Sequence, residues 1–315
     1  MSLVTLEQIY QARERLRGVT VHTRLFPCDG AYLKPESFQP IGSFKLRGAY
    51  NKTAALVEHE RPTGIVAHSS GNHAQGVAYA AQKLGLPAAI VMPNNAPQIK
   101  VEATRSYGAE IIFYDVATER REIVTQRIME DRAGWMLVHP FNDPLIIAGQ
   151  GTIGLEIFED FPDVEQVIVP IGGGGLISGV ATAIKSLKPN VKVIGVEPEL
   201  AADAQQSLRE GQVVEWTAAD TNRTIADGVR TVSVGQLNYE HIRAYVDTII
   251  TVSEAEIRAA VRRLALTAKL VIEPSGAIPF AVWMAHRAQL PVQQNTALVL
   301  SGGNIDPKLL AEIVG

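Results

Sequence analysis

Short runs of consecutive hydrophobic residues alternate along the chain with longer segments whose hydrophobic positions have helical spacing. A run that is hydrophobic throughout is typical of a parallel strand buried on both faces, and the wider spacing is typical of an amphipathic helix. The predicted strands lie at 64–70, 87–93, 109–115, 164–171, 191–199, 246–253 and 295–300. The predicted helices lie at 1–18, 71–85, 96–108, 117–134, 176–189 and 255–269. This alternation predicts an α/β fold with doubly wound sheets.

The length of the chain, 315 residues, fits two lobes or one large α/β unit. The segment around Lys45 and the polar turn near residue 143 interrupt the alternation of strands and helices. We therefore expect a small domain at 50–143, inserted into a large domain formed by residues 1–49 and 144–315.

Composition and charge exclude several classes of protein. Hydrophobic residues make up 46% of the chain and the net charge is −4, so a globular core is expected and a nucleic-acid partner is not. No stretch of about 18 uncharged apolar residues occurs, so no membrane span is expected. The single cysteine, Cys28, cannot form a disulfide within the chain, which favours a cytoplasmic location. No histidine or cysteine signature marks Cys28 as a nucleophile.

Two polar segments in the first half of the chain are candidates for chemistry. Residues 42–48 place Lys45 among small and apolar neighbours, where loss of hydration would lower the pKa of the amine and suit it to Schiff-base formation. A surface lysine at the start of a helix is the alternative. Residues 69–73 join a predicted strand to a predicted helix, whose free N–H groups can bind a carboxylate. Helix capping by Ser70 or Asn72 is the alternative there.

Two glycine-rich segments follow predicted strands in the second half. Gly172, Gly173, Gly174 and Gly175 fit a place where backbone amides approach a phosphate. They match neither the dinucleotide fingerprint, because Ile177 occupies the position of its third glycine, nor the Walker A motif. Residues 301–304 follow the last predicted strand, where Ser301 could face a ring nitrogen. A simple turn is the alternative for both segments.

Together these segments resemble those of the fold-type II pyridoxal-phosphate enzymes, in the branch of the serine/threonine dehydratases and serine racemases. The resemblance rests on residues 43–49, 69–73, 172–175 and 301–304 and covers nearly the whole chain. It implies two lobes like those of the tryptophan synthase β-subunit, pyridoxal 5'-phosphate in the cleft between them, and a homodimer.

The resemblance also implies a role for each segment. Lys45 would carry the cofactor and act as a base, Phe44 would pack beside the ring, and the four glycine amides would hold the phosphate. Asn72 would bond the phenolic oxygen and Ser301 the pyridine nitrogen, and a neutral serine there favours prompt β-elimination. The substrate would contact Ser69, Ser70, Gly71, Asn72, His73 and Gly228. Glu273 resembles a family glutamate near the ring, and its role stays open.

Two features point to different members of this branch. Ser70 resembles the serine racemases and hydroxyaspartate dehydratases, and its hydroxyl, opposite Lys45, could give or take a proton. The turn at 139–144 is more similar to the dehydratases. We expect an ammonia-lyase that converts L-serine or L-threonine to a 2-oxo acid and ammonia. Serine racemase and threo-3-hydroxyaspartate dehydratase activity are the alternatives, and the latter would need a cation, for which Arg121 is a weak candidate.

A metal site is also implied. Glu197, Ala201 and Asp203 match the pattern that binds Mg²⁺ or Ca²⁺ in this branch. Two carboxylates and a backbone carbonyl suit a hard cation, and solvated acids on a loop are the alternative.

Other functions are disfavoured. A β-replacement enzyme would carry a different lysine segment and a threonine-rich glycine loop. A non-catalytic binding protein on this fold is a remote alternative, against which the presence of Lys45 speaks. Because the chain ends at Gly315, soon after the last motif, we expect no feedback inhibition by isoleucine.

Overall fold

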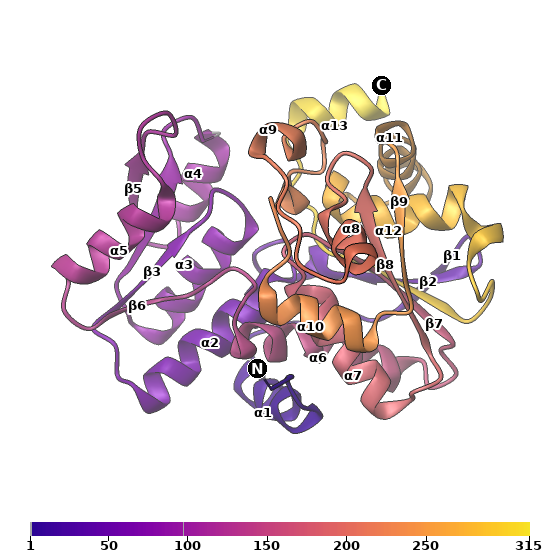
Figure 1. Cartoon of the computed structure of the whole chain (residues 1–315), viewed down its shortest axis with the longest axis horizontal. Coiled ribbons are helices and arrows are strands. Elements are labelled where there is room, and N and C mark those ends of the chain that lie inside the picture. The colour runs from indigo at the N-terminus through magenta and orange to yellow at the C-terminus, as the bar shows by residue number, and fades with distance from the viewer. Residues whose placement is uncertain (1, 97) are drawn as a thin grey trace.

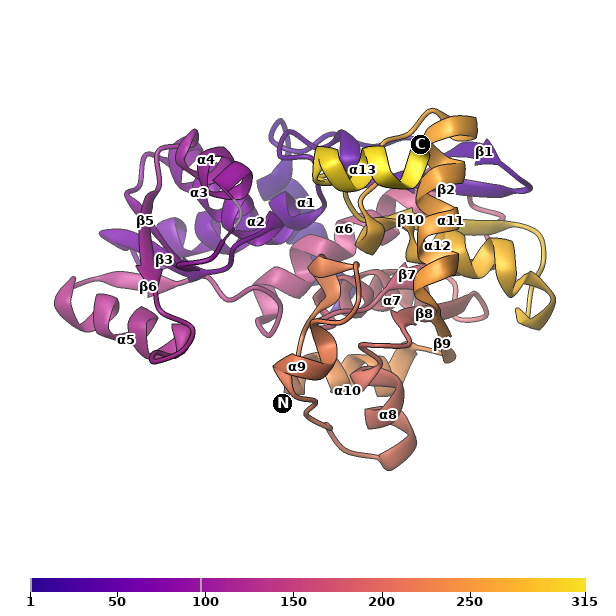
Figure 2. The ribbon, with the colours of Figure 1, turned by 90° about the horizontal axis from the view of Figure 1, so that it is seen from above.

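Two parallel sheets covered by helices divide the molecule into two lobes, which lie side by side in both views (Figure 1 and Figure 2). The computed structural model describes residues 2–96 and 98–315. The predicted α/β fold with two doubly wound lobes is confirmed.

The larger sheet has six strands in the order β1-β2-β10-β7-β8-β9. The strands are β1 (Phe26–Cys28), β2 (Ala31–Pro35), β7 (Gln166–Pro170), β8 (Lys192–Pro198), β9 (Thr248–Val252) and β10 (Thr296–Leu300). β1 and β2 are antiparallel, and all other neighbours are parallel. Because β10 lies between β2 and β7, the first and last parts of the chain meet inside this sheet.

The smaller sheet has four parallel strands in the order β5-β4-β3-β6. The strands are β3 (Gly64–His68), β4 (Ala88–Pro93), β5 (Glu110–Tyr114) and β6 (Trp135–Leu137). All four fall within the predicted small domain at 50–143. The domain boundaries themselves stay a prediction, because helix α2 (Lys45–His59) runs across the first of them.

Helices cover both sheets. Those from the first half of the chain are α1 (Leu6–Leu16), α2, α3 (Asn72–Leu84), α4 (Gln98–Arg105), α5 (Arg121–Asp131) and α6 (Pro144–Asp160). The later ones are α7 (Gly175–Leu187), α8 (Asp203–Glu210), α9 (Ala218–Thr221), α10 (Gln236–Tyr245), α11 (Glu254–Arg263), α12 (Pro274–Ala285) and α13 (Pro307–Val314). Short 3-10 turns occur at η1 (Glu36–Phe38), η2 (Asp227–Val229) and η4 (Arg287–Gln289), and a π-helical turn, η3, at Leu264–Ala268.

The side chains of β7 explain why the strands are hydrophobic throughout. Val167 and Val169 belong to a core that includes residues of α7, whereas Ile168 belongs to a second core that includes residues of α12. Successive side chains of a strand point to opposite faces of the sheet. A strand with helices on both faces therefore buries every position.

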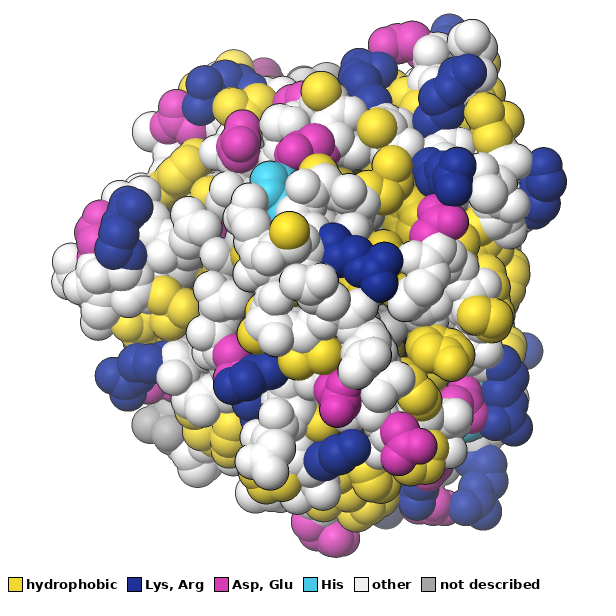
Figure 3. Space-filling model, turned by 90° about the vertical axis from the view of Figure 1, so that its right-hand side faces the viewer, with side chains coloured by type: hydrophobic (Ala, Val, Ile, Leu, Met, Phe, Trp, Pro, Cys, Tyr) yellow, Lys and Arg dark blue, Asp and Glu magenta, His cyan; other side chains and the backbone are white. Residues whose placement is uncertain are grey.

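The distribution of charged side chains is visible on one face of the molecule (Figure 3). On the face in Figure 3, lysines and arginines are interspersed with acidic and hydrophobic side chains, and they form no uniform basic stripe there. Within residues 2–96 and 98–315, no helix combines the length and the apolar composition needed to span a membrane.

Candidate active site

Lys45 begins helix α2, and the backbone before it is fastened to the end of β10. The N–H of Phe44 donates to the carbonyl oxygen of Ser301 at 3.0 Å. Ser43 and Gly302 form an antiparallel bridge. The segments around Lys45 and Ser301, which were predicted from separate motifs, therefore lie together.

The side chain of Lys45 is half-buried and held in place. Its Nζ donates to the carbonyl oxygen of Pro140 at 2.9 Å and lies 5.1 Å from the ring centroid of Phe44. Loss of hydration lowers the pKa of the amine to about 8. A neutral amine is the nucleophile in Schiff-base formation, so the environment of Lys45 suits that chemistry. Lys45 is not a freely solvated surface lysine.

The four glycines form the turn between β7 and α7. Gly174 has a φ of +90°, a backbone conformation that a side chain would strain. In the part of the chain that the structure describes, none of the four backbone N–H groups of residues 172–175 donates to a protein acceptor. Free amides at a helix N-terminus bind anions, so this turn fits a phosphate.

A turn at residues 139–142 lies between Lys45 and the glycines. Pro140 accepts the hydrogen bond from Lys45, and the next residue packs against the glycine turn. A Cβ added at Gly173 would lie 2.3 Å from Cδ1 of Phe141, and one at Gly175 would lie 3.1 Å from its Cα. The turn therefore joins the lysine to the glycine segment, a contact that the sequence did not reveal.

For pyridoxal phosphate, the cofactor that the resemblance implies, we expect the substitution Gly173→Ala to weaken binding by about tenfold or more, because its methyl group would overlap the Phe141 ring and overpacking costs about 1–3 kcal/mol. Equilibrium binding of the cofactor to the apoenzyme measures this effect. Gly172→Ala is the control and should weaken binding less, since its Cβ would lie farther from its nearest neighbour, 3.0 Å from Val229 Cα. Equal affinity of Gly173→Ala and the wild type would contradict the prediction.

The predicted substrate loop connects β3 to α3 and borders open space. Ser69 Oγ accepts the N–H of Gly71 at 3.2 Å, and a Cβ added at Gly71 would meet nothing within 4 Å. Ser70 is half-buried. His73 is buried, its Nε2 lies 2.8 Å from the carbonyl oxygen of Val138, and burial lowers its pKa well below the ordinary value. The ring of His73 is thus neutral and engaged within the protein.

Asn72 belongs to a side-chain network that crosses the two lobes. Its Nδ2 donates to Oε1 of Glu273 at 2.7 Å, and its Oδ1 accepts from Nδ2 of Asn304 at 2.8 Å. One hydrogen on the Asn72 amide remains for a ligand. Burial, assisted by the charge of Asp227, raises the pKa of Glu273 to about 7. The sequence marks Asn304 only as part of a glycine-rich turn and does not predict its contact with Asn72.

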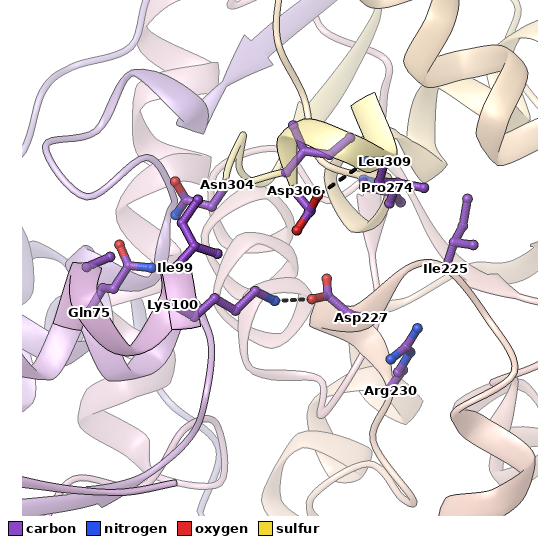
Figure 4. Close-up of a pocket in the computed structure, with 12 residues that line it drawn as sticks. Gln75, Ile99, Lys100, Ile225, Asp227, Arg230, Pro274, Asn304, Asp306 and Leu309 are labelled. Atoms are coloured by element: carbon purple, nitrogen blue, oxygen red, sulfur yellow. Dashed lines mark hydrogen bonds and ion pairs between the residues drawn. The ribbon is translucent and has the colours of Figure 1, made fainter. Parts of the chain in front are cut away.

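A pocket of about 320 Å³ opens beside this network, between the lobes (Figure 4). Asn304 lines it, together with Gln75 and Lys100 from the smaller lobe and Asp227 from the larger one. Lys100 forms an ion pair with Asp227, as Figure 4 shows. The pocket therefore lies next to Gly228, which was predicted to contact the substrate.

Gly228 also lies close to the glycine turn. A Cβ added at Gly172 would lie 3.4 Å from the carbonyl oxygen of Gly228, and the Gly228 N–H donates to Oγ of Ser275 at 2.7 Å. The structure thus brings the predicted residues near Lys45, Asn72, the four glycines, Gly228 and Ser301 into one region through shared neighbours.

The predicted metal ligands lie around the N-terminus of α8. Glu197 and Asp203 are buried, so they are not solvated loop acids. Glu197 accepts two backbone N–H groups of α8 at 2.9 and 2.8 Å, and Asp203 Oδ2 accepts the N–H of Val234 at 2.6 Å. Burial and the charge of Asp203 raise the pKa of Glu197 well above its ordinary value, and burial raises that of Asp203 to about 7.

The second carboxylate oxygen of Asp203 is available to a cation. Asp203 Oδ1 is buried and has no hydrogen-bond partner among the described residues. Residues 2–96 and 98–315 contain no cluster of three or more histidine, cysteine or acidic side chains arranged to hold a metal. A cation here would therefore depend on the two carboxylates, the carbonyl of Ala201 and water.

Known proteins share this architecture. Residues 16–302 match the family described as pyridoxal-phosphate dependent enzymes. L-threonine ammonia-lyase of Thermotoga maritima is 47% identical over 99% of this chain and 78% of its own. L-threo-3-hydroxyaspartate ammonia-lyase of Saccharomyces cerevisiae is 43% identical over 90% of this chain and 85% of its own. The structure of maize serine racemase superposes with a TM-score of 0.92 and 37% identity, covering 99% of this chain and 97% of the maize chain.

Proposed function

Because the chain belongs to the family of pyridoxal-phosphate-dependent enzymes, we propose that it is a lyase that converts L-threonine or L-serine to a 2-oxo acid and ammonia. The observation that carries the proposal is the half-buried Lys45 amine, with its pKa near 8, joined through one turn to four free glycine amides. These residues fit the cofactor, since they offer a nucleophilic amine and an anion site.

Different residues of the site would contact different parts of the cofactor. The amides of 172–175 would hold the phosphate, Phe44 would flank the ring, and Asn72 and Ser301 would bond its polar atoms. When bound, pyridoxal phosphate withdraws electrons from the substrate Cα and so acidifies its proton. Nζ of Lys45 would then accept that proton.

The substrate would be held at the start of α3. Its carboxylate would lie on the loop at 69–73, where the helix N-terminus favours negative charge. Loss of the β-hydroxyl needs a proton, which the hydroxyl of Ser70 would supply. The released enamine would hydrolyse to the 2-oxo acid and ammonia.

The charged side chains around the pocket bear on whether the substrate can carry a second carboxylate. A second carboxylate, as in 3-hydroxyaspartate, would need a free cation near the site. Lys100 is already paired with Asp227, and Arg121 is exposed and paired with Glu122. Arg230 also lines the pocket, and among the described residues its side chain donates only to the carbonyl oxygen of Thr224. A cation is therefore present for a second carboxylate, and we propose serine and threonine first because L-threonine ammonia-lyase is a relative at 47% identity.

Racemisation is a second candidate, and Ser70 is the observation that favours it. A hydroxyl beside open space at the start of α3 could return a proton to Cα from the side opposite Lys45. The relative from maize is named a serine racemase.

A 2-oxo acid assay across L-threonine, D-threonine, L-serine, D-serine and threo-3-hydroxyaspartate tests the proposal, with chiral analysis of the remaining serine. We expect turnover of L-threonine or L-serine above that of hydroxyaspartate. Preferred turnover of hydroxyaspartate would contradict the substrate assignment. No 2-oxo acid from any of them would contradict the lyase.

We also propose that Glu197, Ala201 and Asp203 hold Mg²⁺ or Ca²⁺ in a structural role, since the buried Asp203 Oδ1 needs a positive partner. Chelation should lower the melting temperature by several degrees, because a ligand present at about 100 times its Kd stabilises the fold by about 2.7 kcal/mol. Re-added Ca²⁺ or Mg²⁺ should restore it. Asp203→Asn should make the melting temperature insensitive to chelator, and a wild type that is equally insensitive would contradict the site.

We also propose that the protein forms a homodimer and is located in the cytoplasm. Phe38 and Val271 expose 57% and 51% of their surface, and both lie in segments that approach Gly303. Exposed apolar side chains in neighbouring segments support an interface with a second copy. Light scattering of the purified enzyme measures its mass, and a monomer would contradict this assignment.

A further inference from the structure

One imidazole nitrogen holds the turn between β6 and α6. Nδ1 of His139 accepts the N–H of Asn142 at 2.9 Å and that of Phe141 at 3.2 Å. A ring nitrogen that accepts carries no proton, so the neutral His139 ring must be protonated on Nε2. Two backbone donors of this turn therefore depend on a single acceptor.

The residues enclosed by these hydrogen bonds are the ones that contact the candidate active site. Pro140 offers its carbonyl oxygen to Nζ of Lys45 at 2.9 Å. Phe141 packs so closely on Gly173 that a Cβ there would lie 2.3 Å from its ring. A turn that opened at His139 would move both contacts together.

Two further hydrogen bonds join the turn to helix α10. The carbonyl oxygen of Phe141 accepts from Nδ2 of Asn238 at 3.2 Å, and Oδ1 of Asn142 accepts the N–H of Leu237 at 3.1 Å. Pro140 has no backbone N–H with which to fix itself. Its orientation toward the lysine is therefore set by its neighbours, and His139 bonds the two residues that follow it.

We propose that His139 is a positioning residue, whose unprotonated Nδ1 holds the turn that aims the Pro140 carbonyl at the Lys45 amine and sets Phe141 against the glycine turn. This inference rests on the proposed function, in which Lys45 binds the cofactor. His139 acts on the site through its neighbours in the chain.

The surroundings keep His139 neutral near pH 7. Burial is the main cause that lowers its pKa to about 4; His68, Lys45 and Arg121 act in the same direction, and Asp143 acts in the opposite direction. Protonation would turn the acceptor into a donor facing two N–H groups. The acceptor is therefore available at any pH well above 4.

Two substitutions distinguish the effect of the Nδ1 acceptor of His139 from the effect of its aromatic ring. His139→Phe keeps an aromatic ring beside Phe141, whose ring centroid lies 4.9 Å from that of His139, but removes the acceptor. His139→Asn removes the ring but offers Oδ1, which accepts the N–H two residues on in an Asx turn. We expect His139→Phe to weaken cofactor binding to the apoenzyme by about tenfold or more, and His139→Asn to stay within about threefold of wild type.

A second readout follows the lysine itself. The rate at which the apoenzyme captures pyridoxal phosphate should rise with pH and level off near the pKa of Lys45, about 8 in the wild type. In His139→Phe the opened turn would admit water to the amine and relieve its desolvation, so the midpoint should move to higher pH. In His139→Asn it should stay. A residue that only stabilised the fold would not move this midpoint.

The outcomes are distinguishable. Wild-type affinity and midpoint in His139→Phe, or a His139→Asn variant as weak as His139→Phe, would overturn the inference. If neither variant folds, ¹⁵N NMR of the wild-type imidazole decides, since an unprotonated Nδ1 supports the inference and a protonated one overturns it. A wild type that takes up no cofactor contradicts the proposed function, and the same spectrum still decides whether His139 holds the turn.

Discussion

The Lys45→Ala enzyme is expected to release 2-oxo acid more than about 10³-fold more slowly than wild type and to lack the visible absorbance of bound cofactor. Alanine removes both the amine that would bind the cofactor and the base that would accept the Cα proton. The assay is 2-oxo acid release from L-threonine and L-serine, with an absorbance spectrum of each purified protein.

Lys83→Ala is the matched control for this experiment. Lys83 lies in the last turn of α3 and is exposed, so its loss should leave rate and spectrum near those of wild type. A Lys45→Ala protein that kept the spectrum would place the cofactor on another amine.

The lowered pKa of Lys45 gives the same site a pH signature. With a pKa of about 8, roughly one Lys45 amine in ten is neutral at pH 7. The rate of cofactor capture should therefore rise about tenfold with each unit of increasing pH up to about pH 8 and level off above it. A rate still rising steeply at pH 10 would show that the amine is not desolvated.

The second large effect is expected at Arg47, two residues beyond Lys45. Its side chain is buried, and its Nε lies 2.7 Å from Oε2 of Glu36 and its Nη1 2.6 Å from Oε1 of Glu156. Lys34 is also buried, and its Nζ lies 2.5 Å from Oε2 of Glu156. Four charges of balanced sign therefore lie in the interior and join β2, η1, α2 and α6.

Arg47→Met should destabilise the fold by about 3–5 kcal/mol, because it leaves a buried carboxylate without its partner. For a chain of this size we expect a drop in melting temperature of roughly 5–8 °C, measured by calorimetry. Arg13→Met is the control, since Arg13 pairs with Glu159 at a site where both side chains are more than 40% exposed. Its cost should stay below about 1 kcal/mol, and equal effects of the two substitutions would contradict the prediction.

The sequence predicted the elements whose local pattern is decisive. β3, β4, β7, β8 and β10 are short hydrophobic runs, and each lies where that run predicted a strand. β1 and β6 were not predicted, since each has three residues and β1 contains Pro27. Helix α6 was also missed, because it is buried along most of its length and so lacks the polar stripe that marks a surface helix.

The candidate site shows the same limit. Motifs marked Lys45 and the glycines, because these residue types are unusual in such surroundings. The contacts of Asn72 with Glu273 and of Pro140 with Lys45 join residues far apart in the chain, and each of these residues alone is compatible with an ordinary cap or turn. Arg47 likewise looks like one more charged helix residue until the fold encloses it.

The bridge between Ser43 and Gly302 has a consequence for biosynthesis. Strand β10 pairs with β2, and the loop before Lys45 closes on the residues that follow β10. The ribosome must therefore deliver the chain through strand β10 and Gly302 before this loop can close, however early the four-stranded lobe folds. Capture of vitamin B6 at Lys45, as proposed, would then follow the synthesis of both sheets in a nascent chain.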